Sequence, residues 1–178
     1  KPRLDFARNS VILVTGASEG IGKESVLQLV KSNAKTIICL ARNKEKLESL
    51  LKDSNELKKN SNSNTNVLIF PIDCSDYKQV DKLRDNLLKD GFVPNIICNV
   101  AGAGSFRYLF EENGEHIENC LKAPYLAAAQ ISRAFLPSMI RESTDGKILV
   151  GGLCSEGKGP VQGNESDEVV ATRVKKPW

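Results

Sequence analysis

The stretch VILVTGASEGIG, residues 11–22, decides the fold that we expect for this chain. Its first four residues are apolar and mostly β-branched, which is typical of a strand buried on both faces. Glycines follow at once, and from 21 to 30 the apolar residues cluster on one face, which predicts a helix. Between the two, Gly16 permits a tight turn, Gly20 lets the backbone approach a pyrophosphate, and Gly22 lets the helix pack on the strand. Although glycines also punctuate ordinary turns, their position between a strand and a helix predicts an anion-binding loop.

Apolar runs and helical patterns alternate along the rest of the chain, which predicts an α/β fold. The expected strands after the first are 36–40, 67–70, 96–100 and 147–150, and the expected later helices are 43–59, 76–89 and 114–141. Pro124 is expected to kink or split the last of these helices. We predict a doubly wound parallel sheet with helices on both faces and strand order 3-2-1-4-5. The ligand crevice then lies at the carboxyl ends of the first and fourth strands, where the order reverses.

Composition excludes several classes of function. The chain has 178 residues, with 25 Lys+Arg against 22 Asp+Glu and a net charge of +3, which is too small to recruit nucleic acid. No stretch approaches the roughly 18 apolar residues of a transmembrane helix, and the N-terminus lacks the apolar part of a secretory signal. The five cysteines form no C-x-x-C pair, so we expect neither disulfides nor a metal site. This use of cysteine predicts a reducing compartment.

The motif TGASEGIG resembles the T-G-x-x-x-G-x-G fingerprint of the short-chain dehydrogenase/reductase family. Further segments agree with family motifs in the same order: LARNKEKLE, FPIDCSDY, NVAG, LKAPYLAAAQ, AFLPSM and GKILV. The resemblance covers residues 10–150. It implies a Rossmann fold and an oxidoreductase that transfers hydride between a nicotinamide cofactor and a carbonyl substrate.

The resemblance also implies that the cofactor is NADP(H). Arg42 stands where NADP(H)-preferring members carry a basic residue, and guanidinium is a fixed-charge, bidentate ligand for the 2′-phosphate. Asp73 matches the aspartate that contacts the adenine. Glu19 opposes this assignment slightly, because some NADP-binding members carry a basic residue there, but Arg42 outweighs it. The expected cofactor-binding residues are Gly16, Ser18, Glu19, Gly20, Ile21, Gly22, Arg42, Asp73, Cys74, Asn99, Ala101 and Gly102.

The catalytic half departs from the family pattern. Family members use Asn, Ser, Tyr and Lys, with Tyr and Lys one helical turn apart as Y-x-x-x-K. Here Tyr77, Tyr108 and Tyr125 are followed at that spacing by Asp81, Glu112 and Ala129. Cys120 stands at the position of the helix asparagine and Leu153 at that of the serine. Ser155, two residues later, is the one candidate catalytic residue, and it serves only if its loop shifts.

The C-terminal part is expected to be incomplete. We divide the chain into an NADP(H)-binding Rossmann domain, 1–160, and a tail, 161–178. The tail segment NESDEVVATRV predicts a helix capped by Asn164 or Ser166, similar to a late helix of the family. We find no sixth strand and no Y-x-x-x-K helix before it, so we expect a stretch following Pro160 to be absent from the chain.

A narrower resemblance concerns the substrate. DCSDYKQVDKL followed by GFVPNIICNVAGAG is similar to the 3-ketosphinganine reductases of sphingolipid metabolism. It implies a carbonyl or lipid-like small molecule as partner, and a place in the cytoplasm or on the cytosolic face of the endoplasmic reticulum. A homo-oligomer is left open.

Two functions therefore compete. The first is an NADP(H)-dependent oxidoreductase that reduces 3-ketosphinganine or another long-chain ketone. The second is a catalytically degenerate nucleotide-binding protein that acts as a sensor or partner subunit. The intact cofactor half favours the first, whereas Cys120 and Leu153 favour the second.

Overall fold

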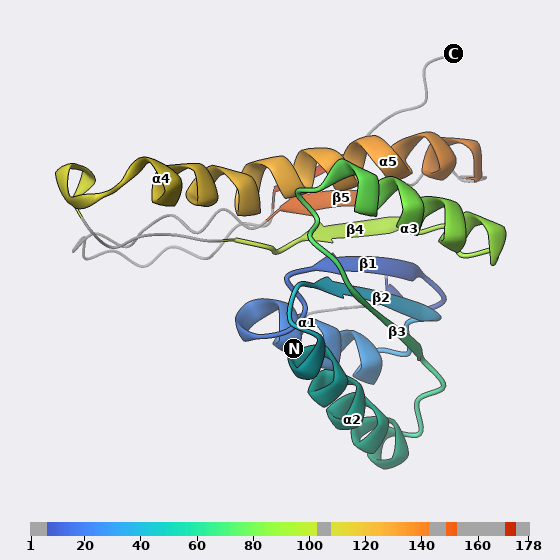
Figure 1. Ribbon diagram of the computed structural model, residues 1–178. Coiled ribbons are helices and arrows are strands. Elements are labelled where there is room, and N and C mark those ends of the chain that lie inside the picture. The colour runs from blue at the N-terminus through green and yellow to red at the C-terminus, as the bar shows by residue number, and fades with distance from the viewer. Residues whose placement is uncertain (1–6, 103–107, 143–148, 153–169, 174–178) are drawn as a thin grey trace.

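Strand β1 (Val11–Thr15) lies inside a six-stranded sheet of order β3-β2-β1-β4-β5-β6 (Figure 1). The computed structural model describes residues 7–102, 108–142, 149–152 and 170–173. Strands β1 to β5 pair in parallel, and β6 pairs antiparallel with β5. The strands after β1 are β2 (Thr36–Ala41), β3 (Asn66–Pro71), β4 (Ile96–Asn99), β5 (Leu149–Gly152) and β6 (Val170–Arg173). The predicted parallel order 3-2-1-4-5 is therefore confirmed.

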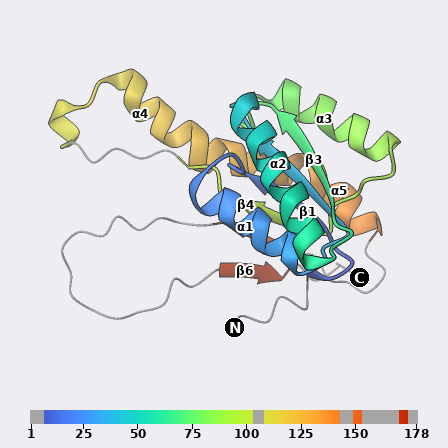
Figure 2. The ribbon, with the colours of Figure 1, turned by 90° about the horizontal axis from the view of Figure 1, so that it is seen from below.

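Two helices cover each face of the sheet. Helices α1 (Gly20–Lys31) and α2 (Lys44–Ser61) pack on one face, as the view from below shows (Figure 2). Helices α3 (Tyr77–Lys89) and α5 (Ala127–Glu142) cover the other face (Figure 1). Alternate residues of β1 explain this arrangement, because successive side chains of a strand point to opposite faces. Ile12 and Val14 join the α1 and α2 side of the core, and Leu13 joins the α3 and α5 side; all three are fully buried.

The long helical pattern that ends with α5 is interrupted near its middle. Helix α4 (Gly114–Leu121) is followed by the π-helical segment η3 (Lys122–Leu126), which leads directly into α5. Pro124 lies in η3, and proline has no N–H to donate to the preceding turn. The expected break at Pro124 is confirmed. A short 3₁₀ helix, η2 (Leu109–Glu111), precedes α4, which projects beyond the edge of the sheet in Figure 1.

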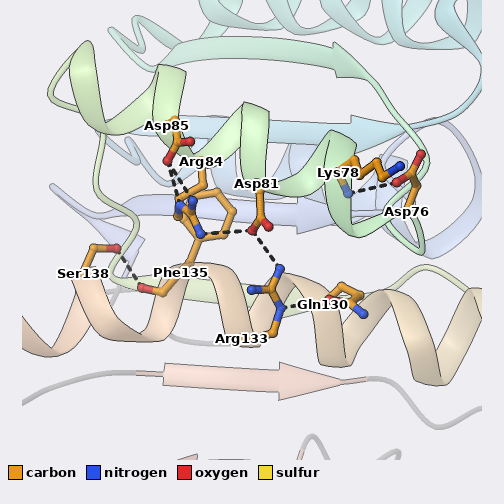
Figure 3. Close-up of polar contacts among 9 residues, drawn as sticks. All are labelled: Asp76, Lys78, Asp81, Arg84, Asp85, Gln130, Arg133, Phe135 and Ser138. Carbon is orange, nitrogen blue, oxygen red and sulfur yellow. Dashed lines mark hydrogen bonds and ion pairs between the residues drawn. The ribbon is translucent and has the colours of Figure 1, made fainter.

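Polar side chains connect α3 to α5 above the sheet (Figure 3). Asp81 Oδ1 accepts hydrogen bonds from Arg84 Nη1, at 3.0 Å, and from Arg133 Nη2, at 2.7 Å. Arg84 also donates to Asp85, so one arginine is shared between two carboxylates. Because Arg133 belongs to α5 and the others to α3, these contacts hold the two helices side by side.

The prediction for the tail is wrong where the structure describes it. Val170–Arg173 forms β6 and not a helix, and the expectation that no sixth strand follows β5 is wrong with it. Val170 and Thr172 are β-branched and favour extended backbone. Pairing with β5 also satisfies backbone groups that an edge strand would leave open. The proposed caps Asn164 and Ser166 and the domain boundary at 160 lie outside the described residues.

Candidate functional site

The turns that follow β1 and β4 are joined by one hydroxyl group. Thr15, at the end of β1, is 1% exposed, and its Oγ1 accepts hydrogen bonds from the backbone N–H of Val100 and of Ala101, both at 3.0 Å. A Cβ at Gly16 would lie 2.8 Å from the backbone of Ala101, so the approach requires glycine. The two turns meet where the strand order reverses, which is the predicted position of the crevice.

The glycines of the β1–α1 loop differ in what surrounds them. Gly16 has φ +66° and Gly20 φ +55°, a region that other residues adopt only with strain. A Cβ at Gly22 would meet the carbonyl oxygen of Gly16, so Gly22 lets α1 begin against the turn as expected. Beside Gly20, no described atom lies within 4 Å of the place a Cβ would take. The loop is therefore closely packed inside and open at Gly20.

The start of α1 offers backbone donors to a ligand. Helices α2, α3 and α4 are capped by the side chains of Asn43, Asp76 and Asn113. At α1 the capping position is Glu19, whose extended backbone leads into the helix, and no side chain among the described residues caps it. The first N–H groups of any helix have no partner within the helix, and they favour an anion. The start of α1 therefore has backbone donors available for an anion.

Two more of the predicted site residues, Ser18 and Ile21, belong to this loop, and Ala17 between them and β1 fastens it. The N–H of Ala17 donates to the carbonyl of Leu40 at 3.2 Å, which fastens the loop to the end of β2. Ser18 is half-buried, and Ile21 is 63% exposed although it is apolar. Residues 18–21 therefore form the more exposed part of the loop, whereas Gly22 is buried.

The end of β2 is basic and exposed. Arg42 follows β2 directly, and within the described part of the chain it has no hydrogen bond or ion pair. Lys46, in the first turn of α2, forms an ion pair with Glu19 of the loop. Sequence reasoning did not select Lys46, although it follows Arg42 by four residues in the segment RNKEK. The guanidinium of Arg42 is free to bind an anionic group.

Asp73 is held in a turn after β3. Its Oδ1 accepts hydrogen bonds from the N–H of Ser75, at 2.9 Å, and from the hydroxyl of Ser75, at 2.7 Å. Its Oδ2 has no hydrogen-bond partner in the described ranges, so one oxygen is left for a donor such as an amino group. The side chain of Cys74 is buried in the core, and burial, with a smaller effect of the Asp73 charge, raises its pKa to about 12. Only the backbone of Cys74 is therefore placed to contact a ligand.

Asn99 is the last residue of β4. The residue is 9% exposed, and its Oδ1 is buried without a hydrogen-bond partner among the residues that the structure describes. A buried acceptor left without a donor costs about 1–3 kcal/mol. Ala101 is half-buried and Gly102 is exposed at the mouth of this turn. The turn thus presents an acceptor that a bound molecule or water would satisfy.

A catalytic centre is not assembled in the part that the structure describes. Ser155 and Leu153 lie outside the described residues. Tyr77, Tyr108 and Tyr125 are 53%, 71% and 73% exposed, and Cys120 is half-buried on α4. No group of three or more metal-binding side chains occurs in the described ranges either. The predicted site residues that the structure describes lie at the end of β4 or in the segments directly after β1, β2, β3 and β4.

Comparison with known proteins decides the family. Residues 10–156 match the family described as short chain dehydrogenase. The chain belongs to the short-chain dehydrogenase family. An NADPH-dependent pterin aldehyde reductase of Arabidopsis thaliana is 31% identical over 140 residues, which cover 75% of this chain and 54% of that protein. The chain spans about half the length of the curated short-chain dehydrogenases it matches.

Solved structures of short-chain dehydrogenases share the fold. L-sorbose reductase from Gluconobacter frateurii, complexed with NADPH and L-sorbose, superposes with a TM-score of 0.66 at 24% identity, covering 78% of this chain and 51% of that one. An alcohol dehydrogenase from Thermococcus sibiricus, complexed with 5-hydroxy-NADP, gives 0.65 at 25% identity, covering 74% and 54%. The described helices include none long and apolar enough to cross a membrane.

Proposed function

We propose that this chain binds NADP(H) at the carboxyl ends of β1 and β4, and that it serves a reductase of carbonyl compounds. The observation that carries the proposal is the junction of Thr15 and Gly16 with the Ala101 turn, beside an uncapped helix start. The relatives above include an NADPH-dependent reductase and structures complexed with NADPH or 5-hydroxy-NADP, which supports the choice of cofactor.

Each predicted residue has a task in this proposal. The backbone from Gly16 to Gly22, with Ser18 and Ile21, holds the pyrophosphate, and the start of α1 stabilises its charge. Arg42 binds the 2′-phosphate. Asp73 and the backbone of Cys74 contact the adenine, while Asn99, Ala101 and Gly102 line the crevice. When bound, the nicotinamide supplies a hydride.

The substrate is proposed on narrower grounds. The similarity of DCSDYKQVDKL and GFVPNIICNVAGAG to 3-ketosphinganine reductases supports a long-chain 3-keto amine. With that substrate the protein would work at the cytosolic face of the endoplasmic reticulum in sphingolipid metabolism. We include in the same proposal that the chain forms a homo-oligomer.

A second function is favoured by a specific observation. Cys120 stands at the position of the family's helix asparagine, and Leu153 stands at that of its serine. A carbonyl oxygen that gains hydride develops negative charge, and a positioned acid contributes roughly 10²–10⁴-fold to the rate. A nucleotide-binding protein without turnover, acting as a sensor or partner subunit, needs no such acid.

One experiment tests the proposed cofactor and the turnover of this chain. NADPH and NADH are titrated into the chain by calorimetry, and NADPH absorbance is then followed with several ketones, including a long-chain 3-keto amine. Binding of NADPH in preference to NADH supports the proposed cofactor. Binding without turnover in residues 1–178 is the expected result, and useful turnover would show that an acid lies among Ser155, Tyr108 and Tyr125.

A further inference from the structure

One ion pair joins the phosphate loop to helix α2. The Glu19 carboxylate accepts a hydrogen bond from the ammonium group of Lys46, 27 residues further along the chain. Both side chains are well exposed, Glu19 by 69% and Lys46 by 50%. Glu19 occupies the capping position of α1, but its side chain does not cap that helix. Its carboxylate pairs with Lys46 instead.

The charged residues around this pair differ in whether they have an ionic partner. Lys44, the neighbouring lysine, pairs with Glu48 on its own helix, at 3.8 Å. Arg42 has no ionic partner within the residues described here. Glu19 is the only charged residue of TGASEGIG, so the one acid of the anion-binding loop is neutralised by Lys46.

We infer that Lys46 is a second specificity-determining cation for the 2′-phosphate, and that Glu19 competes with the phosphate for it. The inference rests on the proposed NADP(H) function. Exposed ion pairs are worth little, and the lysine stem is flexible, so the ammonium can be redirected at small cost. A phosphate carries more charge than a carboxylate and therefore draws Lys46 from Glu19. NADH has no 2′-phosphate and leaves the pair intact.

The exchange predicts opposite effects for the two partners. In Lys46→Met the affinity for NADPH falls by roughly three- to tenfold, because a cation that binds the 2′-phosphate is lost. In Glu19→Gln the affinity for NADPH rises by about threefold, because the competitor is removed. Affinity for NADH stays within about twofold in both variants, since NADH lacks the 2′-phosphate that Lys46 would bind.

The double variant reports competition directly. When the wild type binds NADPH, the Glu19–Lys46 pair must break, and this lowers the affinity for NADPH. The Glu19→Gln variant has no such pair to break. Lys46→Met should therefore weaken NADPH binding more in the Glu19→Gln background than in the wild type. Equal losses in the two backgrounds would overturn the competition between Glu19 and the phosphate.

A matched pair on another helix provides the control. Glu118 and Lys122 of α4 pair at 3.1 Å with the same exposed fractions, 69% and 50%. Glu118→Gln and Lys122→Met make the same changes of charge away from the loop. We expect them to leave the affinities for NADPH and NADH unchanged, and thermal unfolding should show that all variants fold as the wild type does.

The test is calorimetric titration of NADPH and NADH into the full chain and these variants at low salt. If the wild type binds NADPH more tightly than NADH and Lys46→Met has the same affinity for NADPH as the wild type, this inference is overturned and the proposed function stands. Wild type that binds neither cofactor would overturn the proposed function itself. Loss of NADPH affinity confined to Lys46→Met, with gain in Glu19→Gln, is the result we predict.

Discussion

The carbonyl oxygen of Gly16 lies so close to Gly22 that a Cβ built on Gly22 would be 2.1 Å from it. This contact sets the angle at which α1 leaves the loop, and backbone atoms cannot yield as a flexible side chain would. Gly22→Ala should therefore destabilise the fold by about 1–3 kcal/mol and weaken cofactor binding. The free energy of unfolding in urea measures the first effect.

Gly114 provides the matched control for that substitution. It begins α4 without a positive φ, and no described atom lies within 4 Å of the place its Cβ would take. Gly114→Ala should leave stability unchanged or raise it by a few tenths of a kcal/mol, roughly the unfolded-state effect of losing glycine. Equal losses at both glycines would show that the Gly16–Gly22 contact has no special role.

Thr15 should be intolerant of losing its hydroxyl. Its Oγ1 is the acceptor for the N–H groups of Val100 and Ala101, and the residue is buried. Thr15→Val keeps the shape but leaves two donors unsatisfied, which should cost about 2 kcal/mol or more. Thr15→Ser retains the oxygen and should lose less. A valine variant as stable as the serine variant would contradict the bridging role of the hydroxyl.

Buried thiols should make the fold sensitive to alkali. Burial raises the pKa of Cys39 and of Cys74 to about 12, from the ordinary thiol value of 9.0. Between these two values the unfolded chain loses the thiol protons while the folded chain keeps them. Stability should therefore fall as pH rises above about 9, by up to roughly 1.4 kcal/mol per pH unit for each thiol.

The variant Cys39→Ala isolates one of these groups. This variant should be less stable at every pH, because it leaves a small gap in the core. Between pH 9.5 and 10.5 its unfolding free energy should fall less steeply with pH than that of the wild type, and the difference in slope should equal the contribution of one thiol. Denaturant unfolding at several pH values measures the slope. An unchanged slope would mean that Cys39 titrates equally in the folded and unfolded chain.

Much of the fold followed from local patterns. The strands and helices from β1 to β5 lie within two residues of the predicted ranges, because each carries an apolar run or an amphipathic face bounded by turn residues. Asn43 and Asp76 cap the helices that they were expected to begin. The strand β6 was missed because four residues carry little pattern, and their pairing depends on the distant edge of β5.

The site was predictable where it follows a motif and not where it depends on contacts across the fold. The loop glycines and the Asn99 turn come together as strand order requires. The partner of Glu19 is 27 residues away, and no local pattern pairs it with Lys46. The bridging role of Thr15 also needed the structure, although a single hydroxyl at the end of an apolar run marks the position.

The proposed binding of NADP(H) depends on the β1–α1 loop and Arg42. It is tested most directly by calorimetric titration of NADPH and NADH into the wild type and into Arg42→Ala. We predict that the wild type binds NADPH more tightly than NADH by roughly 1–3 kcal/mol and that Arg42→Ala removes most of this difference. Equal affinities in the wild type, or unchanged NADPH binding in Arg42→Ala, would contradict the claim.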